Sequence, residues 1–291
     1  MSFTLKRLSL GDILLSVFVG FIALICVAPF IYVFSMSFTA PDAYIPLRFY
    51  IIPRKWSLEN YQYLLSSNVF ANAISSTTYL TIVGTFVNLL LTFFYAYPLT
   101  RKSLPGRRFF ITLAIFTMLF NAGIVPLYML VRNLHLMDSI WSLILTTATS
   151  AWHIMVVKSF MEGIPDELKE AAKMDGSSEF GLFFRIIMPL SLPCLASFIL
   201  LFAVARWNTY FYAVLFINDT KKWTLQLLVK SLIVDAGSMG ISTQGSTETR
   251  FMPQEPLRMA SVVIAMLPIL VVYPFLQRYF VSGLTLGGVK E

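Results

Sequence analysis

One charged side chain lies well inside a long apolar stretch of this sequence, away from its ends: Arg206, within residues 192–217. A charge in such a stretch is costly and usually faces the interior of a helix bundle or an aqueous cavity. Trp207, Asn208 and Tyr210 follow it closely. Aromatic rings, amides and a guanidinium can bind the faces, hydroxyls and carboxylates of sugars. Two interpretations stay open: the cluster contacts a sugar cargo, or Arg206 pairs with a carboxylate or backbone group of a neighbouring subunit while Trp207 packs in the core.

Three asparagines are further polar residues in or at the ends of apolar stretches: Asn72, Asn88 and Asn121. They could line a path for a polar cargo, and Asn121 is counted with the candidate path residues. Hydrogen bonding between neighbouring helices explains such asparagines equally well, because an amide in a membrane needs a partner.

No group of residues predicts catalysis or cofactor binding. The nearest match to a phosphate-binding P-loop is residues 240–247, where Ser246 stands in place of the required lysine. The two histidines, His135 and His153, lie far apart, and the two cysteines form no CxxC pair. The sequence therefore predicts a chain that is not an enzyme and that binds no cofactor or metal itself.

The composition predicts an integral membrane protein. Of 291 residues, 57% are hydrophobic and only 13% are charged, whereas a soluble domain carries about 25% charged residues. A helix of about 20 apolar residues spans a hydrocarbon core of about 30 Å. We therefore expect an all-α protein with six transmembrane helices and a single membrane domain over residues 1–291. The predicted spans are 13–36, 70–98, 109–131, 139–160, 192–217 and 258–280.

The positions of lysine and arginine predict the orientation, because cytoplasmic loops carry an excess of both. Residues 99–108 contain four of them, Lys6 and Arg7 precede the first span, and the short loop after the third span has only Arg132. We expect both termini and the loop of residues 162–191 to be cytoplasmic. The net charge of +7 fits contact with lipid headgroups, and no basic run interleaved with stacking aromatics predicts nucleic-acid binding.

The loop of residues 162–191 is predicted to form two short helices. Pro165 followed by two acidic residues is typical of a helix start. Gly176 ends this helix, and Ser177 or Ser178 can cap the next one. Apolar residues follow helical spacing in both helices, and two adjacent alanines allow a close approach. Such a hairpin is suited to docking in a groove of a partner protein, although an amphipathic hairpin at the membrane surface without a partner has the same periodicity.

The residue order in this hairpin resembles the EAA loop of binding-protein-dependent ABC importer permeases, and we call residues 164–190 the EAA hairpin. The matching residues are Glu170, Ala171, Ala172, Gly176, Ile186 and Pro189. Met188 stands where this family usually has leucine, a nearly volume-conserving change. The chain is similar, in particular, to the smaller permease subunit of the polysaccharide or oligosaccharide branch of maltose-type carbohydrate-uptake permeases. The stretches that carry this similarity are WSLENYQYLL (56–65), LTRKSLPGRR (99–108), NAGIVPLYMLVRNLHLMDSIWSLI (121–144), ARWNTYFYAVLFI (205–217) and the tail GLTLGGVK (283–290).

This resemblance implies a type I ABC importer permease fold in the bacterial cytoplasmic (inner) membrane, and import of an oligosaccharide, with an acidic one derived from a polysaccharide among the candidates. ATP and Mg would be bound by partner subunits. The implied partners are a second, homologous permease in a heterodimer, two ABC ATPase subunits and an extracytoplasmic solute-binding protein. The residues implied to couple to the ATPase are Glu170, Ala171, Ala172, Asp175, Gly176, Phe180, Ile186 and Pro189.

Other classes of transporter remain as alternatives. The EAA loop is shared across substrate classes, so a peptide or polyamine could be the cargo. An ion-coupled secondary transporter would need acidic or histidine relays within the membrane, and no Asp or Glu lies well inside the six predicted spans. A membrane transferase would need a carboxylate or histidine cluster near one interface, and the sequence offers none that is convincing.

Overall fold

The structure is a computed structural model, and its described part is helical. None of the described residues belongs to a strand; Thr39 and Trp56 form one isolated bridge. The described residues are 10–46, 48, 50–234 and 253–285, with backbone only for 275–285. Lys6 and Arg7, the P-loop-like residues 240–247 and the tail from residue 286 lie outside the described residues.

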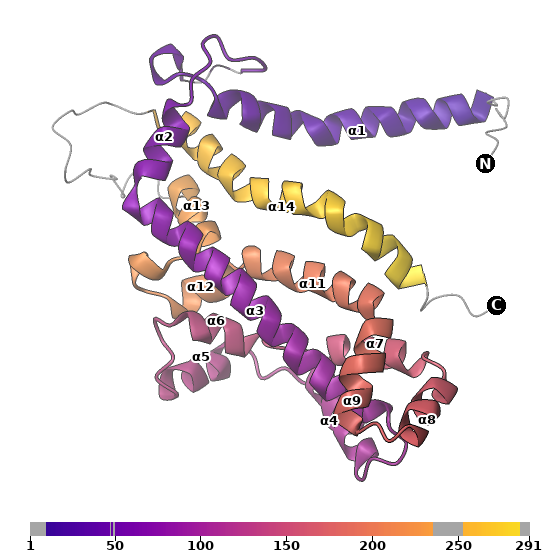
Figure 1. Ribbon diagram of the computed structural model, residues 1–291. Helices are drawn as coiled ribbons and strands as arrows, with labels where there is room; N and C mark the ends of the chain where they lie inside the picture. Colours follow the sequence, from indigo (N-terminus) through magenta and orange to yellow (C-terminus); the bar gives the residue numbers. More distant parts are fainter. Residues whose placement is uncertain (1–9, 47, 49, 235–252, 286–291) are drawn as a thin grey trace. The chain divides into compact units, whose positions relative to one another are not determined.

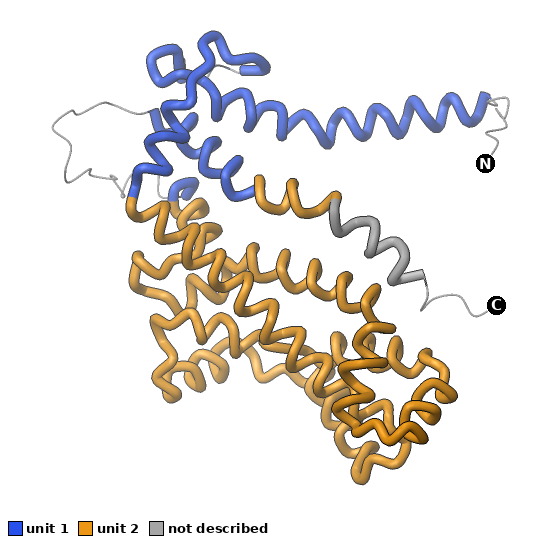
Figure 2. Tube along the Cα trace, in the orientation of Figure 1, with its two compact units in different colours: residues 1–67, 232–266 blue, residues 68–231, 267–291 orange. Residues whose placement is uncertain are grey.

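The chain divides into two compact units, shown in Figure 2. Unit 1 consists of Met1–Ser67 and Leu232–Met266, and unit 2 of Asn68–Ser231 and Leu267–Glu291. Helix α14 (Gln254–Thr285) belongs to unit 1 as far as Met266 and to unit 2 from there on. The single membrane domain over residues 1–291 stays a prediction.

Unit 1 contains one long apolar helix, α1 (Leu10–Ser37) (Figure 1). Residues 10–31 are all exposed within this chain. Helix α2 (Glu59–Ser66) contributes the buried Asn60, whose side-chain amide donates to the carbonyls of Ser37 and Thr39 at 3.1 and 3.0 Å and so closes the end of α1. A helix that is apolar all round and exposed within its own chain needs lipid or another membrane helix to cover it. The short helix η1 covers Pro41–Ala43.

Unit 2 is built around α3 (Asn68–Thr100), which packs along α11 (Leu192–Trp207) and α7 (Ala151–Glu162) (Figure 1). Its buried positions recur every three or four residues, as expected for one face of a helix. Many of them are small or polar, which allows helices in a membrane to approach closely and to share hydrogen bonds. The buried residues of this face include Thr77, Leu80, Gly84, Asn88, Thr92, Ala96 and Leu99.

Three predicted spans are not single continuous helices. The span 109–131 is divided into α4 (Arg107–Leu119) and α5 (Ile124–Asn133), bent by 114°. The span 139–160 is divided into α6 (Ile140–Thr146) and α7, bent by 56°. The span 192–217 is divided into α11 and α12 (Phe211–Phe216).

Local chemistry explains each of these breaks. Gly123, just before α5, has a φ of 86°, which residues with a Cβ rarely adopt, and Pro126 suits the first turn of a new helix. The Ser150 side chain accepts from a backbone N–H in the first turn of α7 and caps that helix. The Asn208 side chain donates to the carbonyl of Val204 at 3.0 Å and closes the last turn of α11.

By length and composition alone, three described helices could each cross a membrane: α1, α3 and the part of α14 up to Pro274. Up to six spans result if each bent pair of helices counts as one. The third such pair joins Glu179–Leu190 to α11 with a bend of 79°, whereas the sequence analysis ended the preceding loop at residue 191. Counted in this way, the span ends with α11 at Trp207. The helix break at residues 208–210 then follows the span, whereas the predicted span 192–217 would have contained it.

Two further helices are η3 (Thr220–Lys222) in unit 2 and α13 (Leu225–Val234), which belongs to unit 2 as far as Ser231. The loop before α6 is tied to the loop after α12 through Asp138, whose φ is 55°. Its carboxylate accepts from the backbone N–H of Asp219 at 2.9 Å and from that of Asn218. These two donors lower the pKa of Asp138 below its usual range, so the carboxylate stays charged and holds the two loops together.

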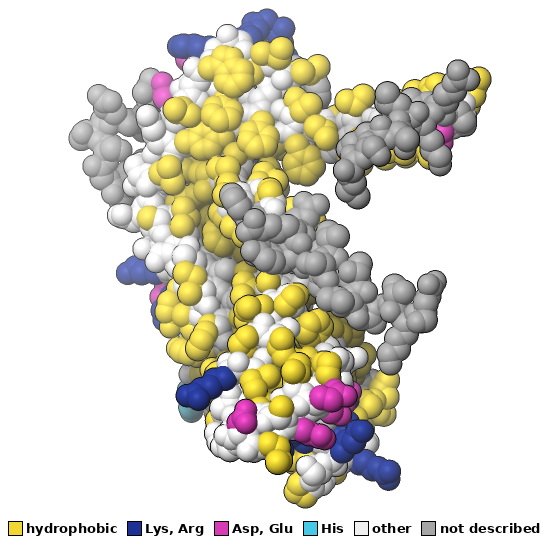
Figure 3. All heavy atoms as spheres, turned by 45° about the vertical axis from the view of Figure 1, so that its right-hand side comes forward, with side chains coloured by type: hydrophobic (Ala, Val, Ile, Leu, Met, Phe, Trp, Pro, Cys, Tyr) yellow, Lys and Arg dark blue, Asp and Glu magenta, His cyan; other side chains and the backbone are white. Residues whose placement is uncertain are grey.

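The surface of unit 2 agrees with a membrane location. In Figure 3, hydrophobic side chains cover much of the visible surface, and one group of acidic and basic side chains lies at its lower end. Large apolar side chains are exposed on the outer face of α3, among them Ile82 and Phe86. A soluble protein rarely exposes so much contiguous apolar surface.

Candidate functional site

The EAA hairpin lies at one end of unit 2 and begins with α8 (Asp166–Met174) (Figure 1). Pro165 precedes the helix, as predicted, and two acidic residues occupy its first turn. Gly176 has a φ of 77°. The N–H of Gly176 bonds to the carbonyl of Lys173 and the N–H of Ser177 to that of Ala172, both at 3.0 Å. This pair of bonds is a Schellman motif, which requires the left-handed conformation that glycine adopts most easily.

The second part of the hairpin contains a widened helical turn. Ser178 caps α9 (Glu179–Leu182) by accepting from the N–H of Gly181 at 3.1 Å. A π-helical turn, η2 (Phe183–Ile187), and α10 (Met188–Leu190) follow before the bend into α11. Pro189 has no N–H to donate, and its ring crowds the preceding turn, which the wider π turn accommodates. The motif proline thus shapes the connection between the hairpin and α11.

The two alanines of the motif differ in exposure. Ala171 is exposed, together with Leu168 and Met174, whose exposed fractions are 45% and 89%. Ala172 is only 7% exposed and packs within the chain. Only one alanine therefore lies on the outer face, whereas the sequence analysis expected both to admit a partner. The apolar row of Leu168, Ala171 and Met174, which we call the outer face of α8, is open within this chain.

The other motif residues differ in exposure. Glu170 and Asp175 are exposed in and just after α8. Phe180 is 71% exposed and borders a hollow of about 410 Å³ beside the end of α3. Ile186 is partly buried against the apolar core of unit 2, and Pro189 is exposed. The predicted coupling residues thus form one continuous element, with some on its surface and others in its packing.

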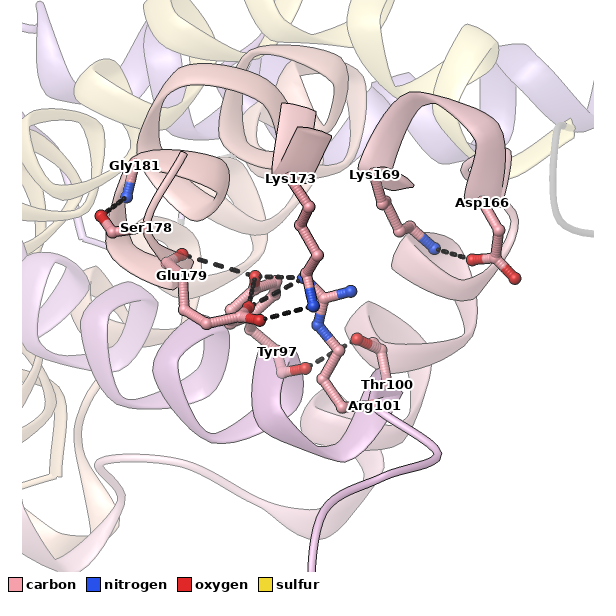
Figure 4. Close-up of polar contacts among 9 residues, drawn as sticks. All are labelled: Tyr97, Thr100, Arg101, Asp166, Lys169, Lys173, Ser178, Glu179 and Gly181. Atoms are coloured by element: carbon pink, nitrogen blue, oxygen red, sulfur yellow. Dashed lines mark hydrogen bonds and ion pairs between the residues drawn. The ribbon is translucent and has the colours of Figure 1, made fainter. Parts of the chain in front are cut away.

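Glu179, which sequence reasoning missed, is the most connected polar residue of the hairpin (Figure 4). Its carboxylate accepts from the Tyr97 hydroxyl at 2.9 Å and from Arg101 Nη2 at 3.0 Å, and it pairs with Lys173 Nζ at 2.8 Å. Lys173 in the first place, and then Tyr97 and Arg101, hold the pKa of Glu179 below its usual range. Nothing in the sequence places residues 97–101 beside residue 179, so no local pattern could have identified this cluster.

Arg206 is bound by its own chain. It is 3% exposed, and its guanidinium donates to the carbonyls of Leu143 at 2.6 Å, Ile144 at 3.1 Å and Thr147 at 2.8 Å. These carbonyls lie at the end of α6, where the last turn has no helical partners for them and the helix dipole is negative. Asn88 Oδ1 and Thr147 Oγ1 accept the remaining hydrogen bonds.

This geometry differs from both interpretations of Arg206 in the sequence analysis. The terminal nitrogens of the guanidinium already donate to partners of the same chain, so neither a cargo carboxylate nor a neighbouring subunit is needed to satisfy them. Asn88 takes the helix-bonding role that was one of its two interpretations. Gly84 makes room for the arginine, because a Cβ there would lie 3.0 Å from its Cδ and Nε. Trp207 is 9% exposed and also belongs to the interior.

The other candidate path residues lie at two different helix breaks. Asn208 and Tyr210 are exposed at the break between α11 and α12, where Asn208 also accepts from Gln226 at 3.3 Å. Asn121 is exposed at the break between α4 and α5, where its side-chain oxygen accepts from the N–H of Gly123 at 2.8 Å. Non-helical backbone at membrane depth is tolerated where it is buried in protein or lines an aqueous cavity, so exposed polar residues at breaks remain candidates for the path.

Comparison with known proteins decides the family. The family described as "Binding-protein-dependent transport system inner membrane component" matches residues 9–286. This chain belongs to that family. The resemblance noted from the EAA hairpin is thereby confirmed, as is the all-helical permease fold.

Individual relatives of this permease match along almost its whole length. It is 41% identical over 283 residues to the polygalacturonan/rhamnogalacturonan transport system permease protein YtcP of Bacillus subtilis, covering 97% of this chain and 98% of that protein. It is 39% identical over 280 residues to Protein LplC of Bacillus subtilis, covering 96% and 94%. A solved crystal structure of a bacterial ABC transporter involved in the import of the acidic polysaccharide alginate matches with a TM-score of 0.87 and 31% identity, covering 94% of this chain and 99% of that chain.

The Schellman turn at Gly176 allows a prediction with a matched control. Gly176→Val is expected to destabilise the turn by about 1–2 kcal/mol, because a β-branched residue is strained in the left-handed region. Gly176→Asn should cost much less, since asparagine tolerates that conformation. Hydrogen exchange of the amides of residues 172–178 in purified protein should be faster in the valine variant than in the asparagine variant. Equal exchange in both would contradict the requirement for a positive φ; Gly20→Val, at a glycine in open space, is the control.

Proposed function

We propose that this chain is the permease subunit of a binding-protein-dependent ABC importer that passes an acidic oligosaccharide into the cytoplasm. The observation that carries the proposal is the EAA hairpin: a glycine-terminated helix with an open apolar face, in a chain that its family matches over residues 9–286. Such a face suits insertion of a helix into a groove of a partner. The energy comes from partner ATPases, which bind ATP and Mg, while this chain binds no cofactor.

The proposed assembly places this permease beside a second, homologous permease in a heterodimer. Two ABC ATPase subunits bind on the cytoplasmic side, and a solute-binding protein delivers cargo from outside. Both termini and the loop of residues 162–191 are cytoplasmic in this arrangement. The four basic residues within 99–108 support this orientation, because they lie next to the end of α3 that carries the hairpin contacts.

The proposed mechanism is linkage between nucleotide state and permease conformation. Closure of the ATPases on ATP favours the outward-facing permease through the EAA hairpin, and hydrolysis reverses the preference. In the hairpin, Glu170 and the outer face of α8 contact the ATPase. Gly176 and Pro189 set the shape of the element, and Ala172 and Ile186 attach it to the core. Asp175 and Phe180 are exposed next to the docking helix and complete the contact surface.

The cargo class comes from the relatives. One relative of 41% identity transports polygalacturonan and rhamnogalacturonan, and the solved relative of 31% identity takes part in alginate import. Both names refer to polymers that contain uronic acids. The bound guanidinium of Arg206 makes it unsuited to hold a cargo carboxylate. Asn208 and Tyr210 at one helix break, and Asn121 at another, are the proposed contacts for sugar hydroxyls and rings.

Reconstitution tests this function. The permease is purified with its partner permease, ATPases and solute-binding protein and placed in liposomes. Uptake is measured for oligogalacturonides, for neutral oligosaccharides of the same length, for a peptide and for a polyamine. We expect uptake of the oligogalacturonide that depends on both ATP and the binding protein and that exceeds uptake of the neutral sugar at least tenfold. Uptake of the peptide or polyamine instead would support the alternative cargo class, and uptake without ATP would contradict the proposal.

A further inference from the structure

One carboxylate joins both helices of the EAA hairpin to α3. Glu179 is the first residue of α9. Its Oε1 lies 2.8 Å from Lys173 Nζ, in the last turn of α8. Its Oε2 accepts from the Tyr97 hydroxyl at 2.9 Å and from Arg101 Nη2 at 3.0 Å, at the end of α3 (Figure 4). The two oxygens thus bind opposite sides, one the hairpin and the other the membrane helix.

The same contact has an aromatic layer. The Arg101 guanidinium lies 5.1 Å from the centroid of the Tyr97 ring and donates to its hydroxyl at 2.7 Å. On the hairpin side, the Phe183 ring lies 4.8 Å from the Tyr97 ring and 5.2 Å from that of Phe94. Hydrophobic contact alone is non-directional, whereas the hydrogen bonds of Glu179 fix the register of α9 against α3.

Other ion pairs of this region do not make the same connection. Asp166 pairs with Lys169 within α8, at 2.8 Å. Glu162 pairs with Arg107, which joins α7 to α4, and with Lys158, which lies in α7 as well. Among the ion pairs of the described residues, the pair of Glu179 with Arg101 is the one that connects the hairpin with the end of α3. Besides these contacts, the hairpin is held by apolar packing, by the attraction of Lys102 and Arg101 for Asp166 and by the chain at both of its ends.

The Glu179 contacts are partly exposed, and such pairs contribute little to the stability of a fold. Their geometry is nevertheless specific, since three donors from two helices converge on one carboxylate and charge-assisted hydrogen bonds are short and directional. An arrangement that adds little stability but fixes the relative position of two helices is suited to transmitting a displacement. α3 is the central helix of unit 2 and packs along α11 and α7, so a displacement of its end reaches most of that unit.

We propose that Glu179 is a positioning residue that makes α3 move together with the EAA hairpin when the ATPases open and close. This inference rests on the proposed function and adds the route by which motion at α8 enters the membrane helices. Glu179 does not touch the ATPase or the cargo in this role. It acts through Tyr97 and Arg101, and a coupling role of this kind has to be shown by coupling measurements rather than by proximity.

The test uses the reconstituted complex and two neutralised carboxylates of the same hairpin. Glu179→Gln keeps the shape of the side chain and removes its charge. Asp166→Asn is the matched control, because its ion pair stays within α8 and Lys102 and Arg101 act on it only through their charge. For Glu179→Gln we expect the ATPases to remain attached and ATP to be hydrolysed, with cargo imported per ATP falling at least fivefold. Asp166→Asn should stay within twofold of the unchanged complex. Glu179→Asp should recover part of the loss.

A double-mutant cycle separates positioning from a general structural effect. Tyr97→Phe removes one hydroxyl and keeps the ring, so the fold has no reason to fail. If the two residues act in one connection, Tyr97→Phe with Glu179→Gln should lower cargo per ATP by less than the product of the single effects. Hydrogen exchange of residues 177–183 should rise in the purified Glu179→Gln permease even without partners. If Glu179→Gln imports as much cargo per ATP as the complex without substitutions, and if its hydrogen exchange is the same, the positioning role is overturned. If the complex without substitutions does not retain its ATPases, the proposed function itself is overturned.

Discussion

Arg206→Ala is expected to destabilise the fold of this permease rather than to change its preference among cargos. The substitution leaves the carbonyls at the end of α6 and the Asn88 amide without their buried donor. Each buried polar group left unsatisfied costs about 1–3 kcal/mol, so the total loss should reach about 3 kcal/mol or more. The measurement is thermal unfolding of the purified permease, together with the yield of monodisperse protein after extraction.

Three companion variants make this result specific. Arg206→Lys keeps a charge but offers fewer and differently placed donors, and should lie between the alanine variant and the unchanged protein. Gly84→Val should reproduce part of the defect, since its side chain would meet the arginine. Arg132→Ala removes an exposed arginine of the same unit and should change stability by less than about 0.5 kcal/mol. A stable Arg206→Ala protein with an altered preference between acidic and neutral sugars would instead place the guanidinium in the cargo path.

The second large effect separates the two alanines of the motif. Ala171→Trp fills the open outer face of α8 and should weaken attachment of the ATPase at least tenfold, which corresponds to about 1.4 kcal/mol. The permease itself should unfold at an unchanged temperature, because residue 171 is exposed. Ala172→Trp should instead lower the unfolding temperature of the permease itself. Residue 172 is buried, and overpacking a filled interior costs about 1–3 kcal/mol.

Co-purification of the ATPase and thermal unfolding of the permease are measured on both variants. Ala171→Ser is the control that keeps the size of the side chain nearly unchanged. The opposite pattern, with the Ala172 variant folded normally but free of ATPase and the Ala171 variant unfolded, would mean that the outer face of α8 has been assigned to the wrong side of the helix.

The hairpin shows what local sequence chemistry can predict. Its ends were expected at Pro165 and Gly176, and the structure places α8 between them. Helix starts and stops depend on a few neighbouring residues, whose caps and φ angles are local properties. The direction in which each alanine faces was not predictable in the same way, because it depends on the core of unit 2 behind α8.

Apolar stretches located the membrane helices but not their breaks. Hydropathy adds up composition over about 20 residues and is insensitive to a cap such as Ser150 or a single φ such as that of Gly123. Arg206 shows the same limit for a site. The cost of its charge predicted that partners must exist, but Asn88 lies 118 positions away in the chain and Leu143 lies 63. Only the packing of α3, α6 and α11 identifies them.

The arginine at the end of α6 has one more consequence. In transporters driven by ion gradients, the free carbonyl ends of broken helices are where the coupling ion is coordinated. Here a side chain of the same chain occupies that end, so sodium would have to displace a guanidinium to bind. The chain thus supplies its own cation at this helix end, in the form of a guanidinium.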